Sequence, residues 1–332
     1  MTIKSPDISQ DQIKPILELF SSGQTQEALD AVGVLIKDYP NDSLLFNISG
    51  ACYAALGQFD AAVKDYEKAI SIKPDYSKAH FNLGCTLQEL GQFYASVKSF
   101  EKALVIEPDY AEAHNNLGIS LKDLRQLDAA VKSFKKAIAI KPDYVEAHYS
   151  LGTLLQELGQ LDEAVKSYEA VLVIKPDFAE MHNNLGVILN KLNQNDAALK
   201  SLERAVTIKP DFAEAHNNLG NLLKELDQHD TALKSYEKAI TIKPDYADAH
   251  NNLGNALYDL GQHDAAVKSY EQALAIKPDF ADVYNNLGIA LKELDQLDAA
   301  VKSYEKALAI KPDHAEAHNN LGNALNDLGQ LD

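Results

Sequence analysis

Apolar side chains recur along most of the chain at intervals of three and four residues. Within residues 213–246 this spacing is carried by Ala215, Leu219, Leu222, Leu223 and Leu226, which would share one side of an α-helix. A second stretch of the same period follows in each segment, for example at Ala266, Val267, Tyr270, Ala273, Leu274 and Ile276. Because the two-residue alternation of a β-strand is missing, we expect paired helices and an all-α fold.

The prolines show how these helix pairs are organised. From Pro40 onward they recur every 34 residues, at Pro40, Pro74, Pro108, Pro142, Pro176, Pro210, Pro244, Pro278 and Pro312. Self-similarity at a fixed period of this size predicts a solenoid, in which each helical hairpin stacks on the one before it.

The repeat boundaries follow from this period. We expect eight full repeats, at residues 43–76, 77–110, 111–144, 145–178, 179–212, 213–246, 247–280 and 281–314. A degenerate repeat at 9–42 precedes them, an incomplete ninth repeat at 315–332 follows, and residues 1–8 are expected to be disordered. Below, "position" denotes a residue's place within its 34-residue repeat, counted from residue 43.

Local signals indicate where each helix begins and ends. The pair Asp211 and Glu214 resembles a capping box at the start of a first helix. Glycine at position 15, as in Gly261, is expected to end that helix. Glycine at position 8, as in Gly220, costs ~1 kcal/mol relative to alanine inside a helix, so we expect the two helices of a repeat to approach closely there.

The repeat resembles the tetratricopeptide repeat (TPR), whose pattern is W-x2-L-G-x2-Y, A-x3-F, P. The corresponding residues are His250, Leu253, Gly254, Leu257, Ala266, Tyr270 and Pro278, with histidine as a departure where the family often has an aromatic residue. The resemblance implies a right-handed superhelix of hairpins, an α-solenoid, in which the polar side of each first helix lines a concave surface. The repeated Ala-His-Asn-Asn-Leu-Gly wording is also similar to the TPR superhelix of O-GlcNAc transferases and to bacterial TPR arrays.

Asparagines recur on the polar side of the first helices, at position 6. They are Asn82, Asn116, Asn184, Asn218, Asn252, Asn286 and Asn320. Because each amide offers donors and an acceptor, such a series can hold a peptide backbone without reading its side chains. The alternative is that these amides cap or bond between adjacent helices.

Position 9 lies at the centre of the same polar side but varies from repeat to repeat. It includes Ile119, Val187, Asn221, Asn255 and Ile289. A merely solvated surface would not require the aliphatic residues, so we predict that specificity for a partner resides there. Drift under weak constraint is the alternative.

Charge restricts the class of partner. With Lys+Arg at 31 and Asp+Glu at 49, the net charge is −18, which argues against nucleic acid and anionic membranes. Positions 2 and 13 are mostly acidic, so we expect a protein or peptide partner that is basic or neutral. The carboxylate clamp of some TPR proteins requires basic residues on this surface, whereas positions 5 and 6 hold none, so no clamp is expected.

The sequence suggests no catalytic, metal or cofactor site. His80, His114, His148, His182, His216, His250 and His318 recur once per repeat, too far apart for two of them to ligate one zinc ion. We expect them to pack or to form hydrogen bonds. Two cysteines cannot form a disulfide framework, which suggests a reducing compartment and a cytoplasmic location.

Two functions remain open at this level. The first is a non-catalytic protein-interaction scaffold that binds extended segments in an asparagine-lined groove. The second is the substrate-recruiting arm of a glycosyltransferase or sulfotransferase, because the last repeat stops before its second helix and the chain is expected to be a fragment.

Overall fold

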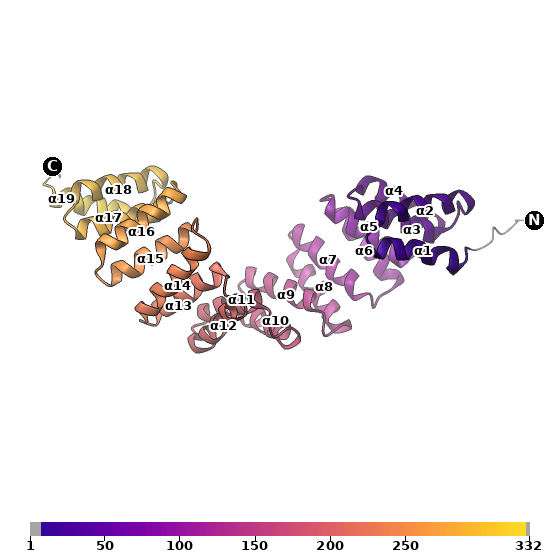
Figure 1. The fold of residues 1–332 in the computed structure, drawn as a ribbon, viewed down its shortest axis with the longest axis horizontal. Coiled ribbons are helices and arrows are strands. Elements are labelled where there is room, and N and C mark those ends of the chain that lie inside the picture. Colours follow the sequence, from indigo (N-terminus) through magenta and orange to yellow (C-terminus); the bar gives the residue numbers. More distant parts are fainter. Residues whose placement is uncertain (1–7, 330–332) are drawn as a thin grey trace, which may run out of the picture. The chain divides into compact units, whose positions relative to one another are not determined.

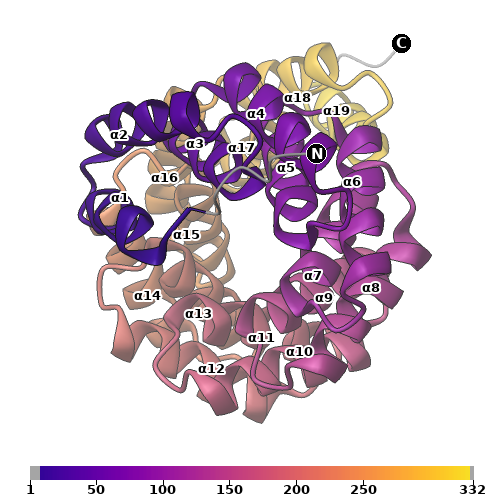
Figure 2. The same cartoon turned by 90° about the vertical axis from the view of Figure 1, so that its right-hand side faces the viewer.

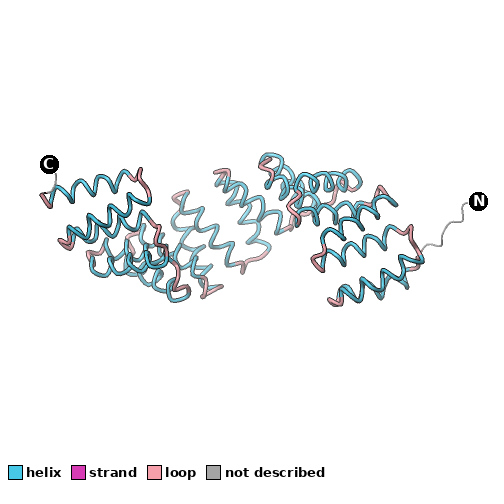
Figure 3. The backbone as a smooth tube through the Cα atoms, turned by 90° about the horizontal axis from the view of Figure 1, so that it is seen from above, coloured by secondary structure: helices cyan, strands magenta, loops and turns pink. Residues whose placement is uncertain are grey.

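The computed structural model describes residues 8–329, and every regular element in this range is an α-helix (Figures 1 and 3). Residues 1–7, which make up most of the segment expected to be disordered, lie outside this range. Residues 330–332, the end of the incomplete repeat, also lie outside it. The helices are α1 (Gln10–Ser21), α2 (Thr25–Asp38), α3 (Ser43–Ala55), α4 (Phe59–Ile72), α5 (Ser77–Glu89), α6 (Phe93–Ile106), α7 (Ala111–Asp123), α8 (Leu127–Ile140), α9 (Val145–Glu157), α10 (Leu161–Ile174), α11 (Ala179–Lys191), α12 (Asn195–Ile208), α13 (Ala213–Glu225), α14 (His229–Ile242), α15 (Ala247–Asp259), α16 (His263–Ile276), α17 (Ala281–Glu293), α18 (Leu297–Ile310) and α19 (Ala315–Asp327).

The chain divides into two units, Met1–Ile174 (unit 1) and Lys175–Asp332 (unit 2). Within each unit an odd-numbered first helix packs against the even-numbered second helix that follows it, and that second helix packs against the next first helix. Successive first helices also touch, as α5 and α7 do in unit 1 and α13 and α15 in unit 2. Figure 2 shows the stacked hairpins of unit 1 in indigo to magenta. This arrangement confirms the predicted all-α solenoid.

In seven of the described hairpins, a glycine of the first helix lies against an aromatic ring of the second helix. Tyr236 of α14 is fully buried between Ala232 and Ala239. A Cβ atom added to Gly220 of α13 would lie 2.6 Å from Cε1 of Tyr236, so only glycine fits there. The close approach expected at position 8 is therefore present, but it joins a glycine to a side-chain ring and not two backbones.

The predicted capping boxes are wrong. Helix α13 begins at Ala213 with Phe212 as its N-cap residue, and no side chain caps it. Asp211 lies one residue too early, because an aromatic residue occupies the N-cap position. That ring is covered instead by a lysine, with Nζ of Lys209 4.9 Å from the ring centroid of Phe212.

Histidine at position 4 closes the turn ahead of seven of the first helices. In α13, Nε2 of His216 lies 3.1 Å from the carbonyl oxygen of Pro210. The same bond occurs at His80, His114, His148, His182, His250 and His318, at 2.8–3.1 Å. Hydrogen bonding was one of the two roles expected of these histidines and is confirmed. Burial lowers the pKa of His114 and His216, so the neutral imidazole is the favoured donor.

The glycines at position 15 end the first helices as predicted. Gly57, Gly91, Gly159, Gly261 and Gly329 all have φ between 67° and 73°, a left-handed conformation that glycine adopts without steric cost. Four other hairpins carry Arg125, Asn193, Asp227 or Asp295 at this place, with φ between 57° and 60°. The backbone therefore keeps the same turn when the glycine is missing.

Candidate functional site

A polar pocket opens in unit 2 between the first helices α11, α13 and α15. Its volume is 450 Å³, and its lining residues are Val187, Asn190, Lys191, Leu202, Asn218, Asn221, Lys224, Glu225, Tyr236, Asn252 and Asn255. Leu202 and Tyr236 come from the second helices α12 and α14 and are almost fully buried. The pocket therefore has an apolar base and polar walls.

A smaller pocket of 160 Å³ continues this surface toward α17. It shares Lys224 and Asn255 with the first pocket and adds Tyr258, Asp259, Tyr270, Asn286 and Ile289. The two pockets together are called the unit 2 groove. This groove brings together Val187, Asn218, Asn221, Asn252, Asn255, Asn286 and Ile289 among the residues predicted to bind.

The remaining predicted residues lie elsewhere. Asn184 is on α11, one turn before Val187, and Asn320 is on α19. Asn82, on α5, and Asn116 and Ile119, on α7, belong to unit 1. They occupy the equivalent positions of their own repeats but are not part of the unit 2 groove.

The position 6 asparagines are tied to the preceding repeat. Nδ2 of Asn218 donates to Oδ1 of Asn183 at 2.9 Å, and Nδ2 of Asn252 donates to Oδ1 of Asn217 at 3.0 Å. The same bond links Asn82 to Asn47, Asn286 to Asn251 and Asn320 to Asn285. These bonds are the asparagine ladder. The alternative predicted from the sequence, hydrogen bonding between adjacent helices, is therefore present. In these bonds the position 6 side chain uses only its amide nitrogen.

The position 5 asparagines that accept these bonds were missed from the sequence. Asn183 and Asn285 are each 1% exposed, and Asn217 is 5% exposed. The signal was the repeated Asn-Asn pair, since two adjacent amides on one helix can reach two different neighbours. Where position 5 is Phe81, Asn116 donates instead to Sγ of Cys85 at 3.3 Å.

The position 9 asparagines are oriented by tyrosines from below. The hydroxyl of Tyr236 donates to Oδ1 of Asn221 at 2.8 Å, and that of Tyr270 donates to Oδ1 of Asn255 at 2.8 Å. Among residues 8–329, Nδ2 of these two asparagines donates to no protein group. Both amides therefore offer a free donor to whatever enters the unit 2 groove.

Residue variation at position 9 follows the residue beneath it at position 24. Asn221, Asn255 and Thr153 accept from a tyrosine hydroxyl. Val187 and Ile119 belong to repeats whose position 24 residues, Leu202 and Phe134, have no hydroxyl. Ile289 is an exception, because it packs in the cluster that contains Tyr304. Much of the variation thus has a packing reason inside the repeat.

Lysines neutralise part of the expected acidic surface. Lys224 pairs with Asp259 at 3.1 Å, and Lys122 and Lys292 make the same pair with Glu157 and Asp327. At position 2, Glu180 pairs with Lys209 at 2.8 Å, which lowers the pKa of that carboxyl through its hydrogen bond. Lys191 is a further basic residue in the lining. The unit 2 groove therefore carries both signs of charge.

The side chains of this groove are suited to hydrogen bonding. Burial raises the pKa of the Tyr236 and Tyr270 hydroxyls, so they stay protonated as donors. In unit 1, burial raises the pKa of the Cys85 thiol to about 11, which leaves it a poor nucleophile at neutral pH. No cluster of three or more metal-ligating side chains occurs in residues 8–329. In the same range, no helix has the length and hydropathy of a bilayer-spanning segment.

Comparison with known families gives one consistent match. The TPR repeat family matches residues 50–91, 86–124, 121–159, 155–192, 188–227, 220–261, 254–295 and 290–329. These segments cover well over half of the chain.

Individual relatives are more distant. The chain is 39% identical over 67 residues to the Hsp70-Hsp90 organising protein of Plasmodium falciparum, a stretch that spans 20% of this chain and 26% of that protein. A tetratricopeptide repeat protein from Parabacteroides merdae has a TM-score of 0.58 at 16% identity, covering 75% of this chain and 98% of that one. The Cut9-Hcn1 structure has a TM-score of 0.56 at 20% identity, covering 90% of this chain and 59% of that one. At these identities the structures show a shared fold.

Proposed function

Because the chain belongs to the tetratricopeptide repeat family, we propose that it is a protein-interaction scaffold that binds an extended peptide in the unit 2 groove. The scaffold itself carries out no reaction. The partner is held mainly through its backbone, with the asparagines of positions 6 and 9 as the contacts.

One observation carries this proposal: the two sets of asparagines expose opposite hydrogen-bonding groups. Asn218 and Asn252 both donate Nδ2 to the asparagine ladder, and among residues 8–329 Oδ1 of Asn218 accepts from no protein group. Oδ1 of Asn252 accepts from Nδ2 of Asn251 at 3.4 Å and has a second lone pair for a further bond. Asn221 and Asn255 spend Oδ1 on a tyrosine and keep Nδ2 as a donor. A peptide unit needs one acceptor for its N–H and one donor for its carbonyl, and the repeats that begin with α13 and α15 each supply both.

The spacing of the helices suits an extended chain. Neighbouring helices pack roughly 8–10 Å apart, and an extended peptide advances ~3.3 Å per residue. One repeat would therefore contact every third peptide unit. The apolar base formed by Leu202 and Tyr236 supports side chains that point down between contacts.

The charges of the groove favour a neutral segment. Glu225 accepts from Nδ2 of Asn190 at 3.0 Å, and Lys224 is paired with Asp259. A chaperone tail held by a carboxylate clamp is not proposed, because the positions that such a clamp requires hold asparagine here. Two free cysteines, Cys52 and Cys85, fit the cytoplasmic location expected from the sequence.

Backbone recognition can be tested with modified peptides. Binders would be selected from a library of uncharged random peptides with the full chain, and each residue of a binder would then be N-methylated or replaced by alanine. N-methylation at every third residue should weaken binding about tenfold, because it removes an N–H and leaves an asparagine acceptor unpaired. Alanine replacements should change affinity much less. The reverse pattern would contradict the proposal.

The chain offers a matched pair of variants for the same test. Asn252→Ala removes a groove contact together with a ladder bond, whereas Asn217→Ala removes only the acceptor of that ladder bond. Both substitutions should lower the free energy of unfolding by about 1 kcal/mol. Only Asn252→Ala should also weaken peptide binding. Equal affinity of both folded variants would remove Asn252 from the binding surface.

A further inference from the structure

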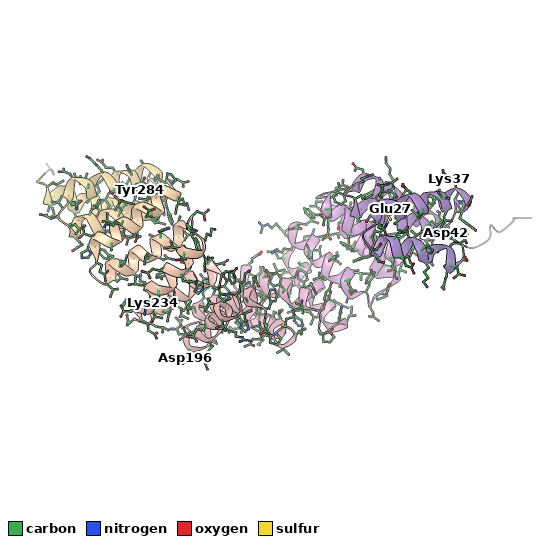
Figure 4. All side chains as sticks on the ribbon, in the orientation of Figure 1. Glu27, Lys37, Asp42, Asp196, Lys234 and Tyr284 are labelled. Carbon is green, nitrogen blue, oxygen red and sulfur yellow. The ribbon has the colours of Figure 1, made fainter. Side chains whose placement is uncertain are left out.

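A second groove lies in unit 1, where the second helices α2 and α4 flank the first helix α3. Its volume is 610 Å³. The lining comprises Gln26, Leu29, Asp30, Gly33, Val34, Ile36, Lys37, Phe46, Ser49, Tyr53, Gln58 and Asp65. Lys37 is labelled on α2 in Figure 4. This surface, called the α2–α4 groove, is built mainly from second helices, unlike the unit 2 groove.

The next repeat contains an equivalent groove that serves as an internal reference. Between α4 and α6 the lining residues are Glu67, Ile70, Ser71, His80, Leu83, Lys98, Ser99 and Lys102, and the volume is 340 Å³. Leu83 and Ser99 hold the repeat positions that Ser49 and Asp65 hold in the α2–α4 groove. The two grooves therefore have the same architecture but different linings.

Three substitutions distinguish the α2–α4 groove from the repeat pattern. Position 7 is leucine in all the following repeats but serine at Ser49, and position 23 is serine in all of them but aspartate at Asp65. Position 25 is glutamate or lysine in the eight full repeats but glycine at Gly33. All three changes fall on one surface. Together they enlarge the groove, make its base polar and place a carboxylate there.

Asp65 cannot form the hydrogen bond that serine forms at position 23. Oγ of Ser99 donates to the carbonyl oxygen of Ala95, one turn earlier on its own helix, at 3.1 Å. A carboxylate has no proton to donate. Burial raises the pKa of Asp65, and the nearby Ser49 hydroxyl offsets only part of this effect. No ion pair to Asp65 occurs among residues 8–329.

Charge and shape point to a cationic occupant. The α2–α4 groove has two carboxylates, Asp30 and Asp65, and one lysine, Lys37. The α4–α6 groove has one carboxylate, Glu67, and two lysines. Asp30 is already engaged by Nε2 of Gln26 at 3.0 Å, so Asp65 is the carboxylate available to a ligand.

The walls around Asp65 are aromatic and aliphatic. Phe46 and Tyr53 line the groove on α3, and Val34, which is 59% exposed, lines it on α2. A planar guanidinium can bond a carboxylate with two N–H groups and stack on aromatic rings, which an ammonium does less well. Its aliphatic stem can lie along apolar walls.

We propose that the α2–α4 groove is a docking site for an arginine side chain of a partner protein. The guanidinium pairs with Asp65 and Ser49, and the stem lies against Val34, Phe46 and Tyr53. This site is independent of the peptide held in the unit 2 groove and supplies a second contact to a partner.

The probe is the capped tripeptide Ac-Leu-Arg-Leu-NH2, titrated into the isotope-labelled full chain and followed by NMR. The backbone amides of Ser49, Tyr53 and Asp65 should shift in a saturable way. Ac-Leu-Gln-Leu-NH2, which has the same apolar residues and no charge, should bind at least about fivefold more weakly. Equal affinity of the two peptides, or no saturation up to about 10 mM, would overturn the proposal.

Three variants locate the site. Asp65→Asn should weaken binding of the arginine peptide about fivefold without unfolding the chain. The double variant Ser49→Leu with Asp65→Ser gives this groove the residues of the α4–α6 groove and should abolish the shifts. Asn218→Ala with Asn252→Ala should leave them unchanged, which separates this site from the unit 2 groove. Undiminished binding by folded Asp65→Asn protein would contradict the assignment.

Discussion

At the scale of single residues, the packing of the eight full repeats depends on a missing Cβ atom. Position 8 is glycine in all eight full repeats. A Cβ added at Gly254 or Gly288 would lie 2.6 Å or 2.5 Å from Cε1 of the tyrosine at position 24, well inside contact distance. The helix-propensity cost of glycine is therefore offset by the burial of a large ring.

Gly220→Ala should lower the free energy of unfolding. The added methyl must displace Tyr236, which costs about 1–3 kcal/mol in a well-packed core. Better helix propensity returns up to about 1 kcal/mol, so we expect a net loss of about 1–2 kcal/mol. Urea unfolding followed by circular dichroism measures it.

Gly322 provides the matched control, because it occupies position 8 of the last repeat and has nothing within 4 Å of an added Cβ. Gly322→Ala should leave stability unchanged or raise it by up to about 1 kcal/mol. If both alanine variants lose stability equally, the ring contact is not the reason for glycine at this position.

At the scale of elements, each hairpin needs one residue in the left-handed conformation between its two helices. Glycine meets this need at Gly23, Gly57, Gly91, Gly159 and Gly261, and a residue other than glycine meets it at Arg125, Asn193, Asp227 and Asp295. Left-handed backbone costs an ordinary L-residue about 1–2 kcal/mol, and asparagine and aspartate less. The turns without glycine therefore store avoidable strain.

Arg125→Gly should stabilise the chain by about 1 kcal/mol, because it removes this strain at φ 58°. Asp295→Gly should gain less and Asn193→Gly least, since their short polar side chains tolerate the conformation. Thermal unfolding midpoints of the three variants would give the order. Equal gains, or a loss at Arg125, would show that the side chain makes a compensating contact.

At the scale of the whole molecule, stability in a solenoid is a sum of repeats and of interfaces between neighbours. The last described helix, α19, packs on α17 and α18. Leu287 and Leu291 of α17 are buried at 7% and 8% exposure, whereas the equivalent Leu321 and Leu325 of α19 are only partly buried. Helix α19 therefore has a smaller share of the core than the first helices before it.

We expect backbone amides over residues 317–328 to exchange with solvent faster than those of 283–294, because partly covered helices open locally at low free energy. Hydrogen exchange followed by mass spectrometry compares the two segments directly. The bond from Asn320 to Asn285 at 2.9 Å is one contact that resists opening. Equal protection of both segments would contradict this expectation.

Local pattern was enough to predict the helices, the solenoid and the ends of the first helices that carry glycine at position 15. Spacing of three and four residues reports which side of a helix is buried, and glycine at position 15 reports a conformation that other residues avoid. Both are properties of neighbouring residues. The capping boxes failed because Asp211 and Glu214 satisfy the spacing rule, while the structure starts the helix after Phe212 and closes the turn with His216 and Pro210.

The sequence by itself determined that a regular series of amides follows the first helices at position 6, because identical residues at a fixed period are visible without coordinates. Only the tertiary structure decided which atoms of the amides at positions 6 and 9 remain free. Nδ2 of Asn218 donates to Asn183 of the neighbouring hairpin, and Oδ1 of Asn221 accepts from Tyr236 of its own hairpin. Hydrogen bonds between repeats join residues 35 positions apart, and no local pattern specifies which donor will meet which acceptor across that distance.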